Sequence, residues 1–584
     1  MNTPPSGVAP KNIPSGPIIG IDLGTSTSAI AFLTPDGEPE LIQDLNGDTI
    51  VPSMVQLLPD GQLVVGSVAK SGAVTYHDRT AMEVKRLMGT GETVKLGKKV
   101  FFPEEIGTEI LKHLKQAAEA KLNREVKDVV ISVPARFENS AREATRKAAE
   151  AAGLEVIRLI NEPTAAALAY GLGHIADQSK VLVFDFGGGT LDVTVLEMFE
   201  GILDIRTSVG DDKLGGKDID EAVMALLRDK FKETTGKKMP PPSRDRKAAQ
   251  RIKEEGEIVK KTLSFSESVQ VNLPNLVGDQ SLVCTITRDE LDAQLEDMLM
   301  RAMAVVNEAL ARARLKWDDI DVILPIGGSS RIPMFRRALQ FASGKELYSG
   351  GLNPDEAVAL GAAIAAGIEQ DLYQKQQKDI MILDVSPHRL GVATIKQVGS
   401  EQFVEDYFSE LIPKDAKLPA ITKRDYMTLS DGTGPIAIRI YEAVTEGNLC
   451  REHRMISELA LRALNKESKD EPVQVEFRYT LDGTLEVAAR YISAPMVQVD
   501  GKFVLDAPGA GGAEIPQEVW RNAPLAGLVL PLIEQVERQV KERPDIASTL
   551  NDMAGFVKLA VIQNDEDEVR KRLDKLTDLL FELT

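Results

Sequence analysis

Apolar residues follow two different periods along most of the chain. From 18 to about 370, short apolar runs of the β type alternate with longer amphipathic segments, which is typical of a mixed α/β domain. One amphipathic segment opens with Ser140 and Glu143, spaced as a capping box, and is followed by Gly153. We therefore expect a helix that is capped by Ser140 and stops at Gly153.

An internal repeat is suggested by two short segments of this region. Ile21-Asp22-Leu23-Gly24-Thr25 can be laid over Phe184-Asp185-Phe186-Gly187-Gly188, and each follows an apolar strand and precedes an alternating one. The match favours a duplicated domain, although a repeat this short also arises by chance.

The pattern changes after Lys378. DIMILD is a short apolar run between acidic ends, and it is either an interdomain linker or an edge strand. From Val385 to about 502 the chain is β-rich, with PIAIRIYEA, VQVEFRY and LEVAARYI separated by turn signals such as Asp431-Gly432 and Asp482-Gly483. This part predicts a β-sandwich. Beyond the small-residue stretch PGAGGAE, apolar residues return to helical spacing and predict a terminal helical unit.

Composition and charge narrow the functional classes. A chain of 584 residues is too long for one core, so several domains are expected. The formal charge of -20 disfavours nucleic acid as a partner. The only cysteines, Cys284 and Cys450, belong to no metal or redox motif. With no signal-like h-region and no apolar run long enough for a membrane, we expect a cytoplasmic protein with a disordered tail over 1–17.

Three glycine-rich turns carry the candidate chemistry. IDLGTSTS and FDFGGGTLD each place an Asp at the end of an apolar strand, before glycines and hydroxyl residues that can turn backbone N–H groups toward phosphate oxygens. Either turn alone is common, but the pair suits a nucleoside triphosphate held from two sides. A third turn, ILPIGGSSRIP, fits contact with ribose or adenine. Neither the Walker nor the Rossmann spacing is present.

In order and wording, these turns resemble the nucleotide-binding signatures of the 70-kDa heat-shock protein family. The resemblance extends to VGSVAKSG, VKRLMG, VISVPARFENSAREAT, VIRLINEPTAAALAYGLG, DDKLGGKDID, VKKTLS, LNPDEAVALGAAIAAGI and KDIMILDVSP, and it is strong over roughly 18 to 395. It implies an α/β actin-like duplicated nucleotide-binding domain, followed by a β-sandwich substrate-binding domain and a short α-helical lid. The implied boundaries are an ATPase domain over 18–375, a linker over 376–384, a peptide-binding domain over 385–512 and a lid over 513–584.

The resemblance implies a site for ATP or ADP with Mg²⁺. The expected phosphate-binding residues are Gly24, Thr25, Ser26, Gly187, Gly188, Gly189 and Thr190. Asp22 and Asp185 are expected to hold Mg²⁺ through water. The expected catalytic residues, which position the attacking water, are Lys85, Glu162, Asp185, Thr190 and Asp192. The adenosine is assigned to Glu257, Lys260, Ser264, Gly327, Gly328, Ser329, Arg331 and Asp355. Lys261 departs from the family's Arg beside the adenine, which predicts weaker nucleotide affinity because an ammonium cannot stack as a guanidinium does.

Further positions resemble the family's allosteric residues. Pro134 and Arg142 match residues that relay the nucleotide state, and Arg158 together with the linker matches the surface that J-domain co-chaperones use. The linker residues are Asp379, Ile380, Met381, Ile382, Leu383 and Asp384. The implied partners are unfolded polypeptide clients, a J-domain co-chaperone and a nucleotide-exchange factor, with no nucleic acid and no membrane.

The resemblance fades in the C-terminal part. His388, Arg389 and Lys396 stand where the family has small or apolar residues, so we expect a preference for peptides with acidic flanks. The implied function is an ATP-hydrolysing molecular chaperone that acts in protein folding and the stress response. Two alternatives remain at this point, a diverged regulatory relative that acts as a nucleotide-exchange partner or scaffold, and a small-molecule kinase with the actin fold.

Overall fold

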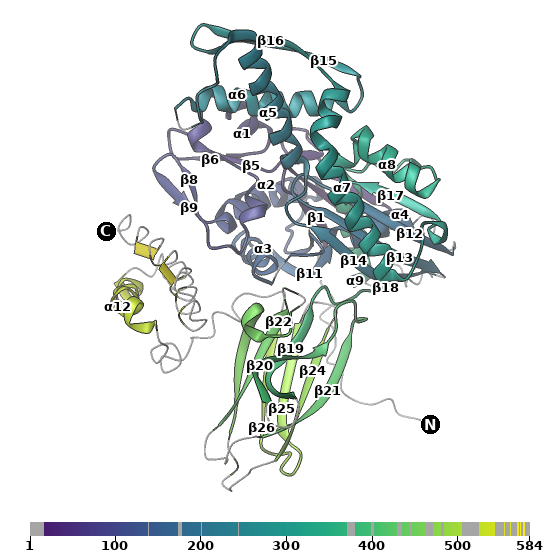
Figure 1. The fold of residues 1–584 in the computed structure, drawn as a ribbon, viewed down its shortest axis with the longest axis vertical. Helices are drawn as coiled ribbons and strands as arrows, with labels where there is room; N and C mark the ends of the chain where they lie inside the picture. Colours follow the sequence, from purple (N-terminus) through teal and green to yellow (C-terminus); the bar gives the residue numbers. More distant parts are fainter. Residues whose placement is uncertain are drawn as a thin grey trace. The chain divides into compact units, whose positions relative to one another are not determined.

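The fold is described from a computed structural model of the chain (Figure 1). The described residues are 17–137, 139–172, 178–199, 201–242, 244–370, 380–398, 402–428, 435–443, 445, 447–462, 464, 471–480, 484–504, 525–542, 554, 557, 561, 569, 570, 573, 576 and 577. They form two compact units. The first comprises Met1–Leu87, Thr93–Phe137 and Lys147–Leu383, and the second comprises Met88–Glu92, Glu138–Arg146 and Asp384–Thr584.

Two sheets with matching local topology form the centre of the first unit. The first has the order β11-β10-β1-β2-β3, with β4 paired to β2, and the second has the order β17-β12-β13-β14-β18. In the first, β1 pairs antiparallel with β2 and parallel with β10, and in the second, β12 pairs antiparallel with β13 and parallel with β17. The repeat in the sequence therefore corresponds to a repeated strand arrangement.

The strands of the first sheet are β1 (Ile19–Leu23), β2 (Thr27–Leu33), β3 (Pro39–Leu41), β4 (Ile50–Pro52), β10 (Asp128–Val133) and β11 (Glu155–Asn161). Those of the second sheet are β12 (Ser179–Phe186), β13 (Leu191–Phe199), β14 (Ile202–Asp211), β17 (Val322–Ile326) and β18 (Met381–Leu383). Smaller sheets are built from β5 (Met54–Leu57), β6 (Leu63–Val65) and β7 (Thr80–Met82), from β8 (Val94–Leu96) and β9 (Lys99–Phe101), and from β15 (Ser268–Val277) and β16 (Gln280–Thr287).

Helices cover these sheets. They are α1 (Ser67–Gly72), α2 (Pro103–Leu122), α3 (Asn139–Ala151), α4 (Glu162–Gly171), α5 (Gly216–Thr235), α6 (Arg246–Leu263), α7 (Arg288–Ala313), α8 (Pro333–Ser343) and α9 (Ala357–Glu369). Short 3₁₀ turns are η1 (His77–Arg79), η2 (Val84–Leu87), η3 (Trp317–Asp319) and η4 (Gly328–Arg331). Among the described residues, no helix combines the length and the apolar character that a membrane crossing requires.

The expected helix after β10 forms, but its start was predicted wrongly. Helix α3 begins at Asn139, so Ser140 lies inside the first turn and does not cap it. A capping pattern identifies which side chains are able to accept from the first turn, and it fixes the end of a helix only to within one or two residues.

Glycines bring α9 close to its neighbours. A Cβ on Gly20 of β1 would lie 2.1 Å from the Ala363 nitrogen of α9, and one on Gly361 would lie 1.7 Å from the Ala165 oxygen of α4. The alanine-rich face of α9 therefore lies directly against β1 and α4, because any side chain at either glycine would separate the layers.

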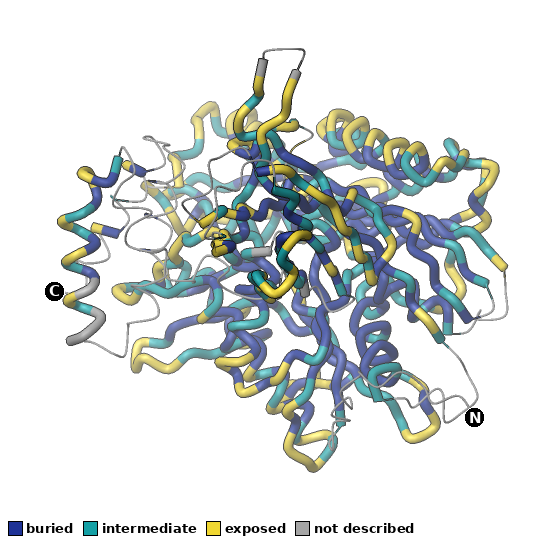
Figure 2. Tube along the Cα trace, turned by 90° about the horizontal axis from the view of Figure 1, so that it is seen from below, coloured by how far each residue is buried: buried dark blue, intermediate teal, exposed yellow. Residues whose placement is uncertain are grey.

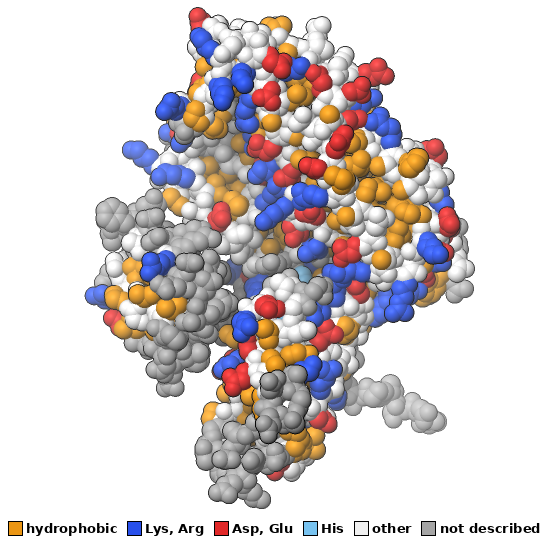
Figure 3. Space-filling view, in the orientation of Figure 1, with side chains coloured by type: hydrophobic (Ala, Val, Ile, Leu, Met, Phe, Trp, Pro, Cys, Tyr) orange, Lys and Arg blue, Asp and Glu red, His pale blue; other side chains and the backbone are white. Residues whose placement is uncertain are grey.

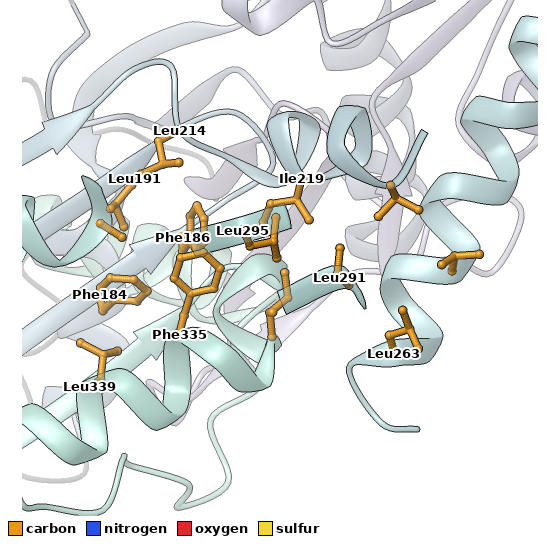
Figure 4. Close-up of a cluster of buried hydrophobic side chains, with 14 of the residues drawn as sticks. Phe184, Phe186, Leu191, Leu214, Ile219, Leu263, Leu291, Leu295, Phe335 and Leu339 are labelled. Carbon is orange, nitrogen blue, oxygen red and sulfur yellow. The ribbon is translucent and has the colours of Figure 1, made fainter. Parts of the chain in front are cut away.

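A large hydrophobic core of the described residues lies between the second sheet and its helices. Phe186 of β12 packs edge-on against Phe184 and Phe335, with ring centroids 5.8 and 4.8 Å apart, and Figure 4 shows these rings with Ile219 of α5 and with leucines of α7 and α8. Burial follows the strands, whereas exposed residues collect at turns and helix surfaces (Figure 2). This core fixes the strand from which the second glycine-rich turn emerges.

The second unit contains two four-stranded antiparallel sheets that share one hydrophobic core, which is a β-sandwich. The sheet orders are β20-β19-β22-β23 and β21-β24-β25-β26. The strands are β19 (Arg389–Val398), β20 (Gln402–Ile412), β21 (Ala420–Met427), β22 (Ile436–Ala443), β23 (Arg454–Leu461), β24 (Pro472–Tyr479), β25 (Thr484–Tyr491) and β26 (Gln498–Val504), with η5 (Cys450–Glu452) between β22 and β23. Both predicted Asp-Gly turns lie outside the described residues.

One helix of the predicted C-terminal helical unit is described in full length. Helix α12 spans Ala526–Glu542, and its buried residues Val529, Ile533 and Val536 keep the helical spacing expected from the sequence. Trp520 lies outside the described residues.

Candidate nucleotide site

The two Asp-containing glycine turns meet in the first unit. A Cβ on Gly188 would lie 2.2 Å from Ser26 Oγ, and a Cβ on Gly189 would lie 2.6 Å from Thr25 Oγ1. Glycine is required at both positions because the turns approach each other to within the space of a methyl group. The structure therefore places the two predicted phosphate-binding turns face to face.

Backbone hydrogen bonds fix the second turn. The Gly187 N–H donates to the Thr190 carbonyl at 3.1 Å, and the N–H groups of Gly216 and Lys217 donate to the carbonyls of Gly187 and Gly188, each at 2.9 Å. The first turn of α5 thus holds the loop from outside. In the first turn, a Cβ on Gly24 would lie 2.0 Å from the Thr27 oxygen, so the chain reverses there with no room for a side chain.

Four carboxylates gather beside these turns. Asp22 lies near the end of β1, Glu162 opens α4, and Asp185 and Asp192 are register partners on β12 and β13. The Ser132 hydroxyl donates to Asp22 Oδ1 at 2.8 Å. Asp185 and Asp192 are 5% and 1% exposed, so their charges are largely removed from water. Such a cluster is unfavourable without a compensating cation.

The pKa values of the aspartates reflect this crowding. Burial, followed by the Glu162 charge, raises the pKa of Asp22 to about 6, although Lys85 opposes the change. The same two causes raise the pKa of Asp192 to about 8. Burial and the neighbouring carboxylates, that of Glu162 first, raise the pKa of Asp185 well above its ordinary value. The cluster therefore favours a bound cation or proton.

Lys85 supplies a positive charge to this carboxylate cluster. It lies in η2, is 6% exposed and forms an ion pair with Glu162. Its ammonium also lies over the Phe137 ring, 5.6 Å from the centroid. The next residue, Arg86, donates to the Gly189 carbonyl and to Asp218 at 2.8 Å. Lys85 and Arg86 therefore link η2 to the carboxylates and to the second glycine turn.

The residues fit Mg²⁺ held through water. Asp185 Oδ2 and Asp192 Oδ1 are buried carboxylate oxygens that have no hydrogen-bond partner among the described residues. Over the same residues, no group of three or more His, Cys, Asp or Glu side chains is arranged to hold a metal ion directly. Oxygen donors with few direct contacts suit Mg²⁺, which keeps most of its water.

The third glycine turn packs against the second. Gly327 has φ +76°, and a Cβ there would lie 2.5 Å from the Phe186 oxygen. The Ser329 hydroxyl donates to the Gly187 carbonyl at 2.9 Å. Arg331 forms an ion pair with Asp355 at 2.8 Å, beside Gly328, whose Cβ would lie 3.2 Å from Asp355 Oδ1. The turn therefore brings these predicted adenosine residues together.

Helix α6 contributes the remaining predicted adenosine residues. Lys260 donates to the Gly216 carbonyl at 3.1 Å and pairs with Asp220 at 2.7 Å. Ser264, one turn further along α6, donates to the Lys260 carbonyl at 3.1 Å. Glu257 pairs with Lys261 at 2.6 Å, and Lys261 is 64% exposed. Lys260 thus faces the glycine turns.

The predicted relay residues have different environments. Pro134 follows β10 and is buried, and Arg142 is buried on α3. Arg158 on β11 is 7% exposed and pairs with Glu369 at 3.3 Å. Little of the Arg158 side chain is therefore exposed in this structure, and its assignment to a co-chaperone surface stays a prediction.

The apolar linker forms an edge strand. Strand β18 pairs in parallel with β14, and the Met381 N–H donates to the Gly201 carbonyl at 3.0 Å. Ile382 is 6% exposed, whereas Met381 is 56% exposed. Asp379 lies outside the described residues, Ile380 precedes the strand, and Leu383 and Asp384 follow Ile382. The segment is thus an edge strand of the second sheet, and it also ends where the first unit passes into the second, after Leu383.

The unusual charges of the β-sandwich have partners within it. His388 lies 3.6 Å from Glu442, and Arg389 donates to the carbonyls of Thr445 and Gly447 at 2.6 and 2.9 Å. Lys396 is exposed and donates to the Tyr407 hydroxyl at 3.0 Å. Of these three residues, Lys396 is therefore the one whose charge is exposed to an approaching peptide.

Sequence reasoning missed several residues of the site. Ser132, Arg136 and Arg86 all contribute hydrogen bonds there, Arg136 through the Gly210 carbonyl at 2.5 Å. Ser132 is a small polar residue within the buried strand β10, and Arg86 follows Lys85 directly. Their partners are distant in sequence, so no local pattern identified them.

Comparison with known proteins decides the family. The family described as Hsp70 protein matches residues 18–96 and 90–499. The chain belongs to the Hsp70 family. The proteins named chaperone protein DnaK of Thermotoga petrophila and Thermotoga maritima are each 34% identical over 581 residues, covering 96% of this chain and 95% of theirs. That of Thermosipho africanus is 32% identical over 574 residues, covering 97% and 91%. This Hsp70 is an ATP-dependent molecular chaperone and an ATPase that binds ATP and ADP.

Proposed function

We propose that the two facing turns hold the β and γ phosphates of ATP and that the carboxylate cluster holds a hydrated Mg²⁺. The observation that carries this proposal is the meeting of Gly188 and Gly189 with Ser26 and Thr25 beside four carboxylates, two of which are buried. The N–H groups of the glycine turns and the hydroxyls of Ser26 and Thr190 supply donors for phosphate oxygens. Mg²⁺, when bound, would offset the charge that the phosphates and carboxylates accumulate.

The hydrolysis step is assigned to positioning and charge. The ammonium of Lys85, held by Glu162, stabilises negative charge on the γ phosphate and orients the attacking water. Glu162 and Asp192 accept hydrogen bonds from that water, and the protein forms no covalent bond with the phosphate. The adenosine lies between α6 and the third turn, against Lys260, Ser264 and Arg331.

The domain roles follow the implied arrangement. In this proposal the first unit has the actin-like duplicated fold, the β-sandwich binds extended apolar segments of unfolded clients, and the helical end serves as a lid. Docking and release of β18 carry the nucleotide state, with Pro134 and Arg142 as relays. A J-domain co-chaperone and a nucleotide-exchange factor act on the first unit, and the protein works in the cytoplasm during stress.

Single-turnover hydrolysis of ATP with and without an unfolded polypeptide tests the proposal. We expect the polypeptide to accelerate hydrolysis, because client binding shifts the equilibrium of the docked linker. A polypeptide that binds without changing the hydrolysis rate would contradict the coupling, and hydrolysis that persists without Mg²⁺ would contradict the assigned metal site.

A further inference from the structure

Glu83 has a backbone conformation that its residue type rarely adopts. It lies between β7 and η2 with φ +60°, in the left-handed region. Asn123 and Arg314 share this region, but both are the C-caps of helices, where a left-handed residue is common. Glu83 ends no helix, so its surroundings must hold it in this conformation.

The first unit has two halves, the first along the chain with the first sheet and the second with the second sheet. Two lysines of the second half hold the carboxylate of Glu83, which belongs to the first half. Lys217 of α5 contacts Oε2 at 2.8 Å, and Lys253 of α6 contacts Oε1 at 2.7 Å. The Glu83 side chain is 17% exposed. Burial raises the pKa of Glu83, but the two lysines outweigh burial and bring the pKa below its ordinary value, so the charged form is favoured.

These contacts lie directly beside the proposed catalytic lysine. Lys85 follows Glu83 by two positions and pairs with Glu162, while Arg86 reaches the Gly189 carbonyl and Asp218. Lys217 also takes part twice, because its N–H donates to the Gly188 carbonyl while its ammonium binds Glu83. The segment 83–86 is therefore anchored on α5 and α6 while it presents Lys85 to the first half.

We propose that Glu83 is a positioning residue, whose two ion pairs hold the left-handed turn that sets Lys85 against Glu162. Lys85 is then correctly placed only while α5 and α6 keep their places against this turn, which couples the arrangement of the two halves to hydrolysis. The inference rests on the role of Lys85 proposed above. It predicts that loss of the Glu83 charge lowers the hydrolysis rate and leaves ATP affinity nearly unchanged.

Two substitutions separate the charge of Glu83 from its backbone strain, with the full-length chain measured for single-turnover hydrolysis and for equilibrium ATP binding. Glu83→Gln keeps the shape and removes the charge, and we expect the hydrolysis rate to fall about tenfold with ATP affinity within about twofold. Glu83→Gly permits the left-handed turn but lacks the carboxylate, and we expect a similar loss. Glu92→Gln, an exposed acid nearby, is the matched control and should keep the rate.

Reversing the charges of Glu83 and its two lysine partners gives a second test of the ion pairs. Glu83→Lys alone should lower the rate at least as much as Glu83→Gln, and adding Lys217→Glu and Lys253→Glu should restore it to within about threefold, because the ion pairs re-form with opposite signs. A wild-type rate in Glu83→Gln or in Glu83→Gly, a parallel loss of ATP affinity, or no rescue would each overturn the inference. If Lys85→Ala still hydrolyses ATP, the proposed site fails instead.

Discussion

The two units differ in how far the charges of their buried acidic residues are balanced by cations. The first gathers Asp22, Glu162, Asp185 and Asp192, of which Asp185 and Asp192 are buried, and Lys85 and Arg136 offset only part of their charge. The second fills its interior with apolar side chains, and its buried Glu442, 3% exposed, lies within 4 Å of both His388 and Arg454. On the face of the described residues that Figure 3 shows, charges of both signs are interspersed.

The difference in buried charge indicates which unit binds a charged ligand and which unit depends mainly on apolar packing. Unbalanced buried charge costs stability, so its persistence in the first unit indicates a charged ligand. Balanced charge in the β-sandwich supports the fold, so binding there depends on surface and shape. Each unit should therefore respond to a different kind of substitution.

The largest effect is expected from Lys85→Ala. Removing the ammonium that pairs with Glu162 should lower single-turnover hydrolysis by about a hundredfold or more, because charge stabilisation and water positioning are lost together. ATP binding should remain, since the glycine turns and α6 are unchanged. Unchanged turnover, or complete loss of ATP binding measured by titration, would contradict this assignment.

A cavity in the β-sandwich should affect stability without affecting the ATPase site. Phe477 on β24 is fully buried in the shared core, and Phe477→Ala should destabilise the sandwich by about 3–5 kcal/mol. Thermal unfolding should show one transition shifted down while basal hydrolysis at low temperature persists. Arg478→Ala, on the exposed side of the same strand, should change stability by less than about 0.5 kcal/mol. Equal effects of the two substitutions would argue against the described core.

Substitutions in the linker strand β18 should change the stimulation of hydrolysis by a client. Ile382→Asp would bury an unpaired charge at the edge of the second sheet, so β18 should undock and stimulation of hydrolysis by a client should disappear while basal hydrolysis remains. Met381→Asp, at an exposed position of the same strand, should retain most of the stimulation. In a Trp317→Phe background, the emission of Trp520 should respond to ATP in the parent and not in Ile382→Asp. An identical response in both proteins would show that the linker connects the two units without transmitting the nucleotide state.

The smallest effect concerns peptide choice. Because His388 and Arg389 have partners inside the sandwich, Lys396 alone should favour peptides with acidic flanks, and Lys396→Glu should shift relative affinity toward basic flanks by about twofold to fourfold. A peptide array read by fluorescence polarisation measures this shift. A parent protein that already prefers basic flanks would show that Lys396 does not set the choice.

By itself, the sequence determined the elements and the motifs that depend on short-range pattern. Strand alternation, helical stripes and the Asp-Gly turns are local, because each needs only residues that are neighbours along the chain. They indicated the mixed α/β region, the β-sandwich strands and the three glycine turns, whereas the individual nucleotide-site residues came from the family resemblance. The apolar linker also had to be buried, since water disfavours Ile382 and its neighbours.

Only the tertiary structure decided which distant residues meet. It placed Glu83 between Lys217 and Lys253, paired Arg158 with Glu369, and gave Arg389 the Thr445 carbonyl as a partner. Such pairings arise when packed cores bring together segments that are far apart along the chain. The sequence does not show whether a charged side chain will have an ion-pair partner or stay in water. The free energy of burying that side chain depends on the partner.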